Sequence, residues 1–278
     1  MQSRETYEAA LKAARASGDR RNETLALSGL GATEHWIGSH TEGRAHTNAS
    51  VSLSRSLRDP LLITLSLIWA HATRGGKYDG RPPVAELEEA LQLARRLGDL
   101  WCEAHAHNGL GDLFTEMGRT TDASSHYELA LEGFRILKDR WLMAWTLQGL
   151  CRAHLLESSA ERACTSIRES IRLFSELGDR TNTIAMLGWL GRALLLSGNQ
   201  NDAATILGAF LSLETTTIDG TVHSEPNTEF SLACKMARTK APAAWISGEA
   251  MTYDQIVARV TGSKGSTAGS GGISRASG

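Results

Sequence analysis

A repeat of 40 residues is the feature of this chain that most restricts its fold. Aspartate recurs at that interval, without any insertion, at Asp19, Asp59, Asp99, Asp139 and Asp179. Apolar residues keep the same register, and eleven positions after each aspartate stand Leu30, Ala70, Leu110, Leu150 and Leu190. A period of this size is typical of solenoids, in which each unit buries its apolar face against its neighbours. The sequence therefore predicts an array of stacked units.

Each unit is predicted to be a pair of antiparallel helices. An aspartate side chain accepts hydrogen bonds from the free N–H groups of a first helical turn, so each aspartate should begin a helix. The preceding helix should end in the left-handed conformation that glycine adopts easily, and glycine stands there as Gly18, Gly98 and Gly178. Arg58 and Lys138 replace it in two units, which should cost a little local strain.

A second turn is expected inside each unit, at 75–83, 118–121 and 197–201 in three of them. Helices of roughly 15–18 residues result, about 25 Å long. Helix-forming residues dominate up to about residue 214, and the chain holds only five prolines. We therefore divide the chain into a repeat array at 1–214, a loop with C-terminal cap helices at 215–261, and a disordered Gly/Ser-rich tail at 262–278.

Composition and charge argue against nucleic acid and membranes as binding partners. The formal net charge is −2, with 41% hydrophobic and 22% charged residues, which gives no overall attraction to nucleic acid or anionic membrane. No apolar run is long enough to span a bilayer, and the N-terminus lacks the apolar core of a signal peptide. We expect a cytoplasmic protein that binds neither nucleic acid directly nor membrane. The four cysteines show no close pairing and should be small buried residues.

The repeat resembles the tetratricopeptide repeat. The third unit carries the small and large residues of that family at its spacing, as Leu110, Gly111, Phe114, Ala123, Tyr127 and Ala130. The period is 40 residues here and commonly 34 in the family. The resemblance implies an all-α fold: a right-handed superhelix of about five hairpins, closed by cap helices at the C-terminus.

The longer, Leu-Gly-Asp-punctuated repeat is also similar to the C-terminal region of LuxR-type and related ATP-binding bacterial transcription regulators. The segment 244–252, with Trp245 and Gly248, looks like the closing signature of that region, and the likeness covers residues 5–261. It implies a module that binds a protein, a peptide or a small effector. The chain has neither a phosphate-binding loop nor a basic recognition helix. We expect a detached regulator region or a stand-alone relative; the alternative is a free-standing adaptor unrelated to transcription.

The inner, concave face is where the family binds its partners. Carrying its groove positions across gives Trp36, His105, Asn108, Asp112, Trp145, Gln148, Arg152 and Arg192. Arg152 and Arg192 are equivalent residues of consecutive units, and two guanidinium groups along one groove could hold a carboxylate or a phosphate. The competing interpretation is that both are solvated or paired with glutamate. Trp101 and Trp141 are also equivalent, and packing between units is their expected role.

No catalytic or metal site is predicted, and no cofactor. The glycines of Gly109-Leu110-Gly111 fall within a helix, where they allow close helix contact and do not cradle phosphate. His105 and His107 are two residues apart, and His35 and His40 are five apart, whereas two rings share a helix face at a spacing of three or four. We therefore expect a binding protein and not an enzyme.

Overall fold

The computed structural model describes residues 2–74, 82–216 and 228–262, and this part of the chain is helical, with no strand. Its helices are α1 (Gln2–Ser17), α2 (Arg20–Trp36), α3 (His40–Leu57), α4 (Pro60–Arg74), α5 (Val84–Leu97), α6 (Leu100–Glu116), α7 (Thr120–Leu137), α8 (Arg140–Leu156), α9 (Ala160–Glu176), α10 (Arg180–Leu196), α11 (Gln200–Thr216), α12 (Thr228–Lys240), α13 (Pro242–Glu249) and α14 (Tyr253–Thr261). None of them is long and apolar enough to cross a membrane. The all-α class and the repeated helical hairpins are confirmed.

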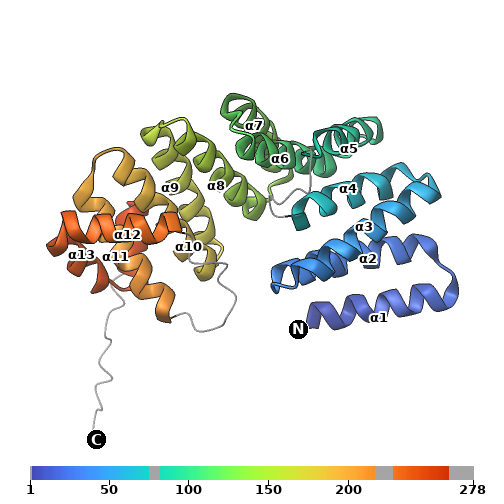
Figure 1. The fold of residues 1–278 in the computed structure, drawn as a ribbon, viewed down its shortest axis with the longest axis horizontal. Coiled ribbons are helices and arrows are strands. Elements are labelled where there is room, and N and C mark those ends of the chain that lie inside the picture. Colours follow the sequence, from blue (N-terminus) through green and yellow to red (C-terminus); the bar gives the residue numbers. More distant parts are fainter. Residues whose placement is uncertain (1, 75–81, 217–227, 263–278) are drawn as a thin grey trace, which may run out of the picture.

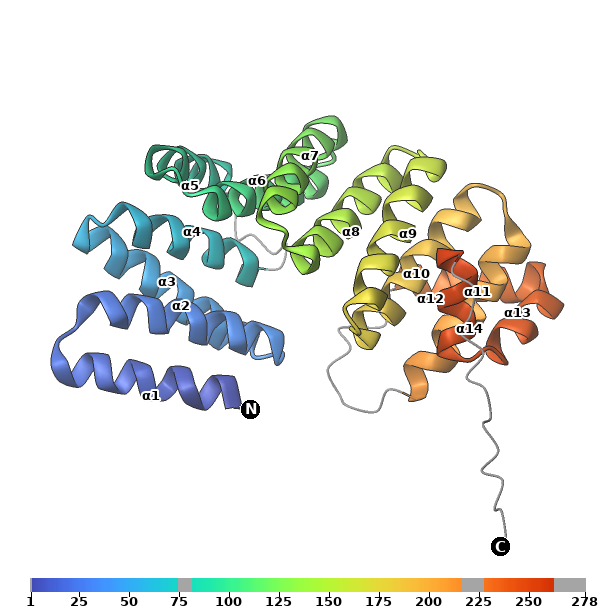
Figure 2. The same ribbon diagram turned by 180° about the vertical axis from the view of Figure 1, so that it is seen from behind.

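Helices that follow one another in the chain pack side by side. Each of α1 to α10 packs against the next, and α4, α6 and α8 also contact one another in sequence. The stack bends into an arc with α1 at one end, α6 and α7 near the top, and α11 to α14 at the other end (Figures 1 and 2). The arc brings its two ends toward the same side of the molecule.

The five repeated aspartates begin helices as predicted. The side chains of Asp19, Asp99, Asp139 and Asp179 each accept a hydrogen bond from the backbone N–H three residues ahead. Asp59 accepts from the N–H groups of residues 61 and 62. Because each carboxylate satisfies a donor that the helix itself leaves unpaired, it fixes the residue at which the helix begins. The 40-residue register is therefore visible directly in the backbone.

The helix before each aspartate ends in a left-handed residue, also as predicted. Gly98 has φ +66°, and Arg58 and Lys138 adopt the same conformation at φ +54° and +58°. A side chain with a Cβ is disfavoured there by about 1–2 kcal/mol. The strain expected at these two positions is thus present.

Replacing Lys138 by glycine should therefore stabilise the fold. We expect a gain of about 0.5–1 kcal/mol in the free energy of unfolding, because relief of the left-handed strain exceeds the greater chain entropy of glycine in the unfolded state. Urea denaturation of Lys138→Gly and the wild type measures the difference. Lys235→Ala, a change at an exposed helical lysine, is the control. A destabilised Lys138→Gly chain would contradict the strain assignment.

Close contacts between hairpins depend on small residues. Tyr127 of α7 is fully buried, and its ring lies against Gly111 of α6 and Gly149 of α8. A Cβ built on either glycine would come within 2.7 Å of the tyrosine ring. The mid-helix glycines therefore serve close helix packing, as expected, and the core runs continuously from α4 to α14.

The C-terminal cap consists of α12, α13 and α14, of which α13 packs on α11 and α14 on α9. Trp245 of α13 is almost fully buried in the core. The helix α11 continues to Thr216, slightly past the predicted end of the array at 214. Residues 217–227, most of the predicted loop, and 263–278, nearly all of the predicted tail, lie outside the described residues.

Candidate binding site on the inner face of the arc

A row of polar side chains joins α6 to α8. Asn108 and Asp112 lie one turn apart on α6, with Asn108 Nδ2 3.4 Å from Asp112 Oδ2. Thr146 of α8 donates to Asn108 Oδ1 at 2.8 Å. Arg152 of α8, the residue equivalent to Asp112 in the next unit, places Nη1 3.9 Å from Asp112 Oδ1. The structure therefore brings three of the predicted groove residues together.

A buried phenol anchors this row. Tyr127 donates its hydroxyl hydrogen to Asp112 Oδ1 at 2.8 Å. Burial, reinforced by the Asp112 carboxylate, raises the pKa of Tyr127 well above its usual value, so the phenol stays protonated and remains a donor. Arg152 is 32% exposed, and its 3.9 Å contact with Asp112 exceeds hydrogen-bond distance. Its guanidinium therefore keeps donors available for a ligand.

An aromatic contact crosses the inside of the arc. The ring of Trp36, at the end of α2, lies 5.9 Å from the ring of Trp145 on α8. Trp145 also packs against Trp141 and, edge to face, against Phe174, at 5.8 and 5.7 Å. Trp36 is 46% exposed. The indole N–H of Trp145 is buried and has no hydrogen-bond partner among the residues that the structure describes. Trp36 thus presents the accessible side of the cluster.

The same aromatic arrangement occurs one unit earlier. His105 occupies the position equivalent to Trp145, and its ring lies 3.9 Å from that of Trp101 and 5.1 Å from that of Phe134. Burial lowers the pKa of His105 to about 4, so the ring is neutral at pH 7. The ring contacts of both arrangements lie within one hairpin, α6 with α7 and α8 with α9. The packing between units expected for Trp101 and Trp141 is seen for Trp141, whose indole N–H donates to Asp179 of the next unit at 3.2 Å.

The last two predicted groove residues lie differently. The guanidinium of Arg192 stands over the rings of Trp189 and Phe230, at 4.9 and 5.1 Å from their centroids. Gln148, at the position equivalent to Asn108, is half-buried on α8. Arg152 and Arg192 therefore have different neighbours, a carboxylate for one and two aromatic rings for the other.

The structure contains two close histidine pairs that the sequence did not predict, because only spacings within a single helix were considered. His35 and His40 meet across the turn between α2 and α3, with their Nδ1 atoms 3.3 Å apart. His107 of α6 and His126 of α7 meet in the same way at 2.8 Å. A hairpin brings together residues at spacings that no single helix allows. Within 2–74, 82–216 and 228–262, no group of three or more His, Cys, Asp or Glu side chains could hold a metal ion.

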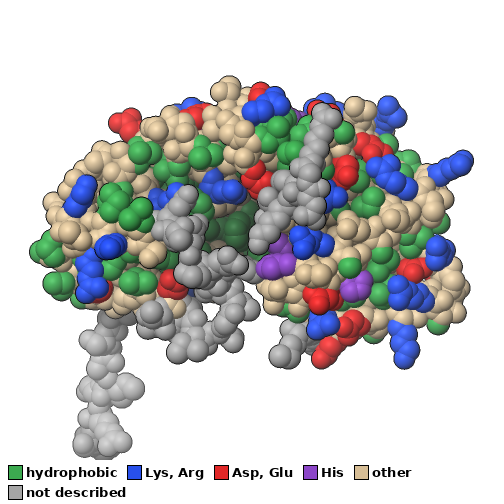
Figure 3. Space-filling view, viewed as in Figure 1, with side chains coloured by type: hydrophobic (Ala, Val, Ile, Leu, Met, Phe, Trp, Pro, Cys, Tyr) green, Lys and Arg blue, Asp and Glu red, His purple; other side chains and the backbone are tan. Residues whose placement is uncertain are grey.

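One face of the molecule is hollowed (Figure 3). The face seen in Figure 3 is hollowed near its middle, with hydrophobic side chains in the depth of the hollow and charged side chains around it. Two of the cysteines, Cys102 and Cys151, are buried in the core. Burial raises the pKa of both thiols to about 12, so they stay protonated at neutral pH.

Comparison with known proteins gives the fold. No protein-family model matches the chain, and no curated protein sequence matches it either. Among solved structures, the crystal structure of BtubC (BKLC) from P. vanneervenii is similar, with a TM-score of 0.58 and 18% identity. The match covers 82% of this chain and 91% of that one. At this identity the likeness concerns the arrangement of helices alone.

Proposed function

We propose that the chain is a tetratricopeptide-type binding module, coiled as a right-handed superhelix, that holds a protein, a peptide or a small effector on the inner face of the arc. The proposed role is that of a sensing or interaction module in a bacterial transcription regulator. It is a role of binding and not of catalysis.

The packing of the third unit supports the tetratricopeptide type. The residues that carry the resemblance are the ones that meet between α6 and α7: Ala123, Tyr127 and Ala130 are fully buried. Gly111 admits the Tyr127 ring at a distance that no larger residue would allow. This close packing of small against large residues is what supports the proposed tetratricopeptide type.

The observation that carries the proposed function is the position of Arg152. This half-exposed guanidinium has an acidic neighbour, Asp112, beyond hydrogen-bond distance, while Tyr127 and Asn108 hold that neighbour in place. A ligand carboxylate can therefore bond to Arg152 without first breaking a tight ion pair. The exposed ring of Trp36 offers an apolar surface on the same inner side. A peptide with an acidic and an apolar side chain would match these two groups.

Arg152→Ala and Trp36→Ala test the proposal better than a change at Trp145, which would also remove packing against Phe174. Purified wild-type chain and each variant are used to capture proteins and small molecules from the native host. We expect a bound species that both variants lose. Arg162→Ala, which removes an exposed arginine of α9 that contacts Glu157, should retain it.

The identity of that species separates the two candidate roles. A transcription regulator or a component of the transcription machinery would support the regulatory role, and a groove-dependent partner from outside transcription would favour an adaptor. If the variants and the control retain the same species, the inner face is not the binding site. Thermal melting of each variant verifies that folding is unchanged.

A further inference from the structure

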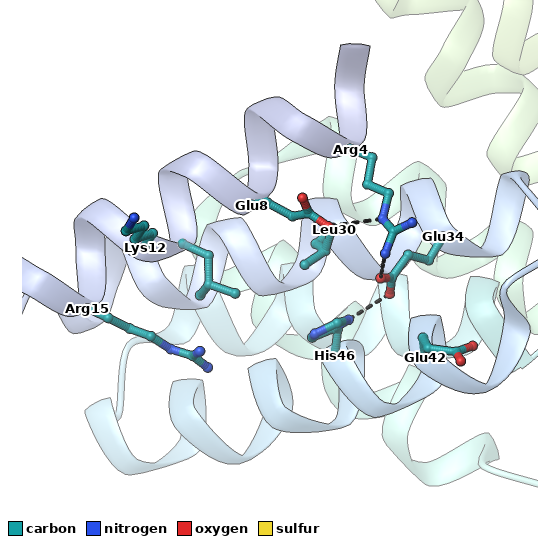
Figure 4. Close-up of a pocket in the computed structure, with 9 residues that line it drawn as sticks. Arg4, Glu8, Lys12, Arg15, Leu30, Glu34, Glu42 and His46 are labelled. Carbon is teal, nitrogen blue, oxygen red and sulfur yellow. Dashed lines mark hydrogen bonds and ion pairs between the residues drawn. The ribbon is translucent and has the colours of Figure 1, made fainter. Parts of the chain in front are cut away.

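A separate pocket lies at the N-terminal end of the array. Helices α1 and α3 both pack on α2 and leave a space of about 460 Å³ between them (Figure 4). This volume falls in the range of small-molecule sites, about 300–1,000 Å³. Leu11 and Leu30 contribute buried apolar surface to it. The pocket is made by helices other than those that carry the row from Asn108 to Arg152.

One side of the pocket holds a buried carboxylate. Glu34, near the C-terminal end of α2, is only 2% exposed. Its Oε2 atom lies 2.6 Å from His46 Nδ1, whereas the nearest cation to Oε1 is the Arg4 guanidinium at 3.9 Å. A carboxylate can accept about four hydrogen bonds, and burial makes unused acceptors costly. Glu34 therefore retains the capacity to accept hydrogen bonds from a ligand cation.

Charges of opposite sign stand on opposite walls of the pocket. Lys12 projects from α1 and Glu42 from α3, and within the described part of the chain neither forms an ion pair (Figure 4). The other cations of α1 have acidic neighbours: Arg15 contacts Glu23 at 3.0 Å and Arg4 contacts Glu8 at 3.1 Å. Apart from these paired groups, the pocket offers the Lys12 cation on the α1 side and the Glu34 and Glu42 carboxylates on the other.

We propose that this pocket binds a small zwitterion with an apolar body, of the size and chemistry of a free dipeptide. Its ammonium group is held by Glu34, with Glu42 beside it, and its carboxylate by Lys12. The apolar side chains cover Leu11 and Leu30. A dianion such as a phosphate ester has no donor cation for the Glu34 carboxylate, and a plain cation leaves Lys12 without a partner.

Titration calorimetry of the full chain with the dipeptide Leu-Leu tests the assignment. We expect saturable binding, and binding at least tenfold weaker for both the N-acetylated and the C-amidated dipeptide, because each lacks one charge. Glu34→Gln and Lys12→Ala should each weaken binding of the free dipeptide at least tenfold. Lys235→Ala, an exposed lysine on α12, should leave the affinity unchanged.

Measuring each modified dipeptide with each protein variant shows which side chain binds which charge of the ligand. The amidated dipeptide should bind Lys12→Ala as it binds the wild type, and the acetylated dipeptide should bind Glu34→Gln as it binds the wild type. Lys12 is exposed, so its replacement leaves the fold intact even if Glu34→Gln proves unstable. Absence of saturable Leu-Leu binding at millimolar concentration, or fully additive losses in these combinations, overturns the proposal. The inner-face variants Arg152→Ala and Trp36→Ala retain dipeptide binding, so the two sites succeed or fail independently.

Discussion

Protonation of His105 and His107 is expected to remove about 3–4 kcal/mol from the free energy of unfolding when the pH falls from 7 to 5. His71, His126 and His154, whose pKa burial also lowers, add to that loss. Burial lowers the pKa of the His105 and His107 rings to about 4, against 6.5 for an ordinary histidine. The folded chain therefore keeps both rings neutral, whereas the unfolded chain binds protons below pH 6.5. The stability that depends on neutral rings is present above pH 6.5 and is lost as the pH falls toward 4, at roughly 2 kcal/mol for each ring by pH 5.

The contacts of His107 explain why protonation is unfavourable. The guanidinium of Arg95, which can only donate, lies 3.2 Å from His107 Nε2. The ring must therefore carry its hydrogen on Nδ1 and donate it to Nδ1 of His126, 2.8 Å away. A second proton on either ring would face an arginine or another N–H group. Glu103, at 4.0 Å, offsets this repulsion only in part.

Urea denaturation at pH 7, 6 and 5 measures this loss. His105→Phe preserves an aromatic ring between Trp101 and Phe134 and should remove about 2 kcal/mol of the loss between pH 7 and 5. Ser247→Ala, which changes an exposed residue of α13 and no ionisable group, should leave the pH dependence as in the wild type. Equal stability at pH 7 and 5 would show that these rings are charged or solvated in the folded chain. Carboxylates of lowered pKa, such as Asp202 beside Arg259, lose their contribution only at still lower pH.

The fold could be predicted because its determinants are local. An aspartate that begins a helix acts on the next three residues, and a left-handed residue acts on the turn before it, so both are readable in the repeat. Even the two departures, Arg58 and Lys138, keep the left-handed conformation of the glycines they replace. Repetition then extends one unit to the whole array, because each unit packs mainly on its neighbours.

The candidate site could be predicted only in part because its contacts are long-range. The row from Asn108 to Arg152 follows the period, since Asp112 and Arg152 are equivalent positions of neighbouring units. The contact of Trp36 with Trp145 spans several units and depends on the curvature of the arc, which no local pattern encodes. The pairing of His107 with His126 depends on how two helices face each other across a hairpin. The pocket beside Glu34 likewise arises from the space between α1 and α3.

Replacing Gly248 by alanine is expected to destabilise the C-terminal cap by about 3 kcal/mol or more. Within an isolated helix this change would stabilise by about 1 kcal/mol, because alanine is the better helix former. In the folded protein, packing reverses the sign of this effect, so that alanine destabilises. A Cβ on Gly248 would lie 2.1 Å from the carbonyl oxygen of Thr205 and 2.8 Å from its carbonyl carbon. These are backbone atoms of α11, so relief requires the two helices to separate.

Separation would cost the interactions that hold α13 in place. Gly208 of α11 lies equally close to α13, since a Cβ there would stand 2.5 Å from the carbonyl oxygen of Trp245. The indole of Trp245 is 2% exposed and fills the core between these helices. Moving α13 outward exposes that indole and breaks the hydrogen bond from Ser212 to the Glu249 carbonyl, at 3.1 Å. Steric exclusion therefore outweighs helix propensity severalfold.

The neighbouring residue provides a matched control, because Ser247 is exposed on the same helix. Ser247→Ala should change the free energy of unfolding by no more than about 0.5 kcal/mol. Urea denaturation compares the two variants, and limited proteolysis should cleave Gly248→Ala earlier within 228–262 than it cleaves the wild type. A Gly248→Ala chain as stable as Ser247→Ala would mean that α11 and α13 do not meet through their backbones. The cap would then have to be held by side-chain packing alone, and Gly208→Ala would be tolerated as well.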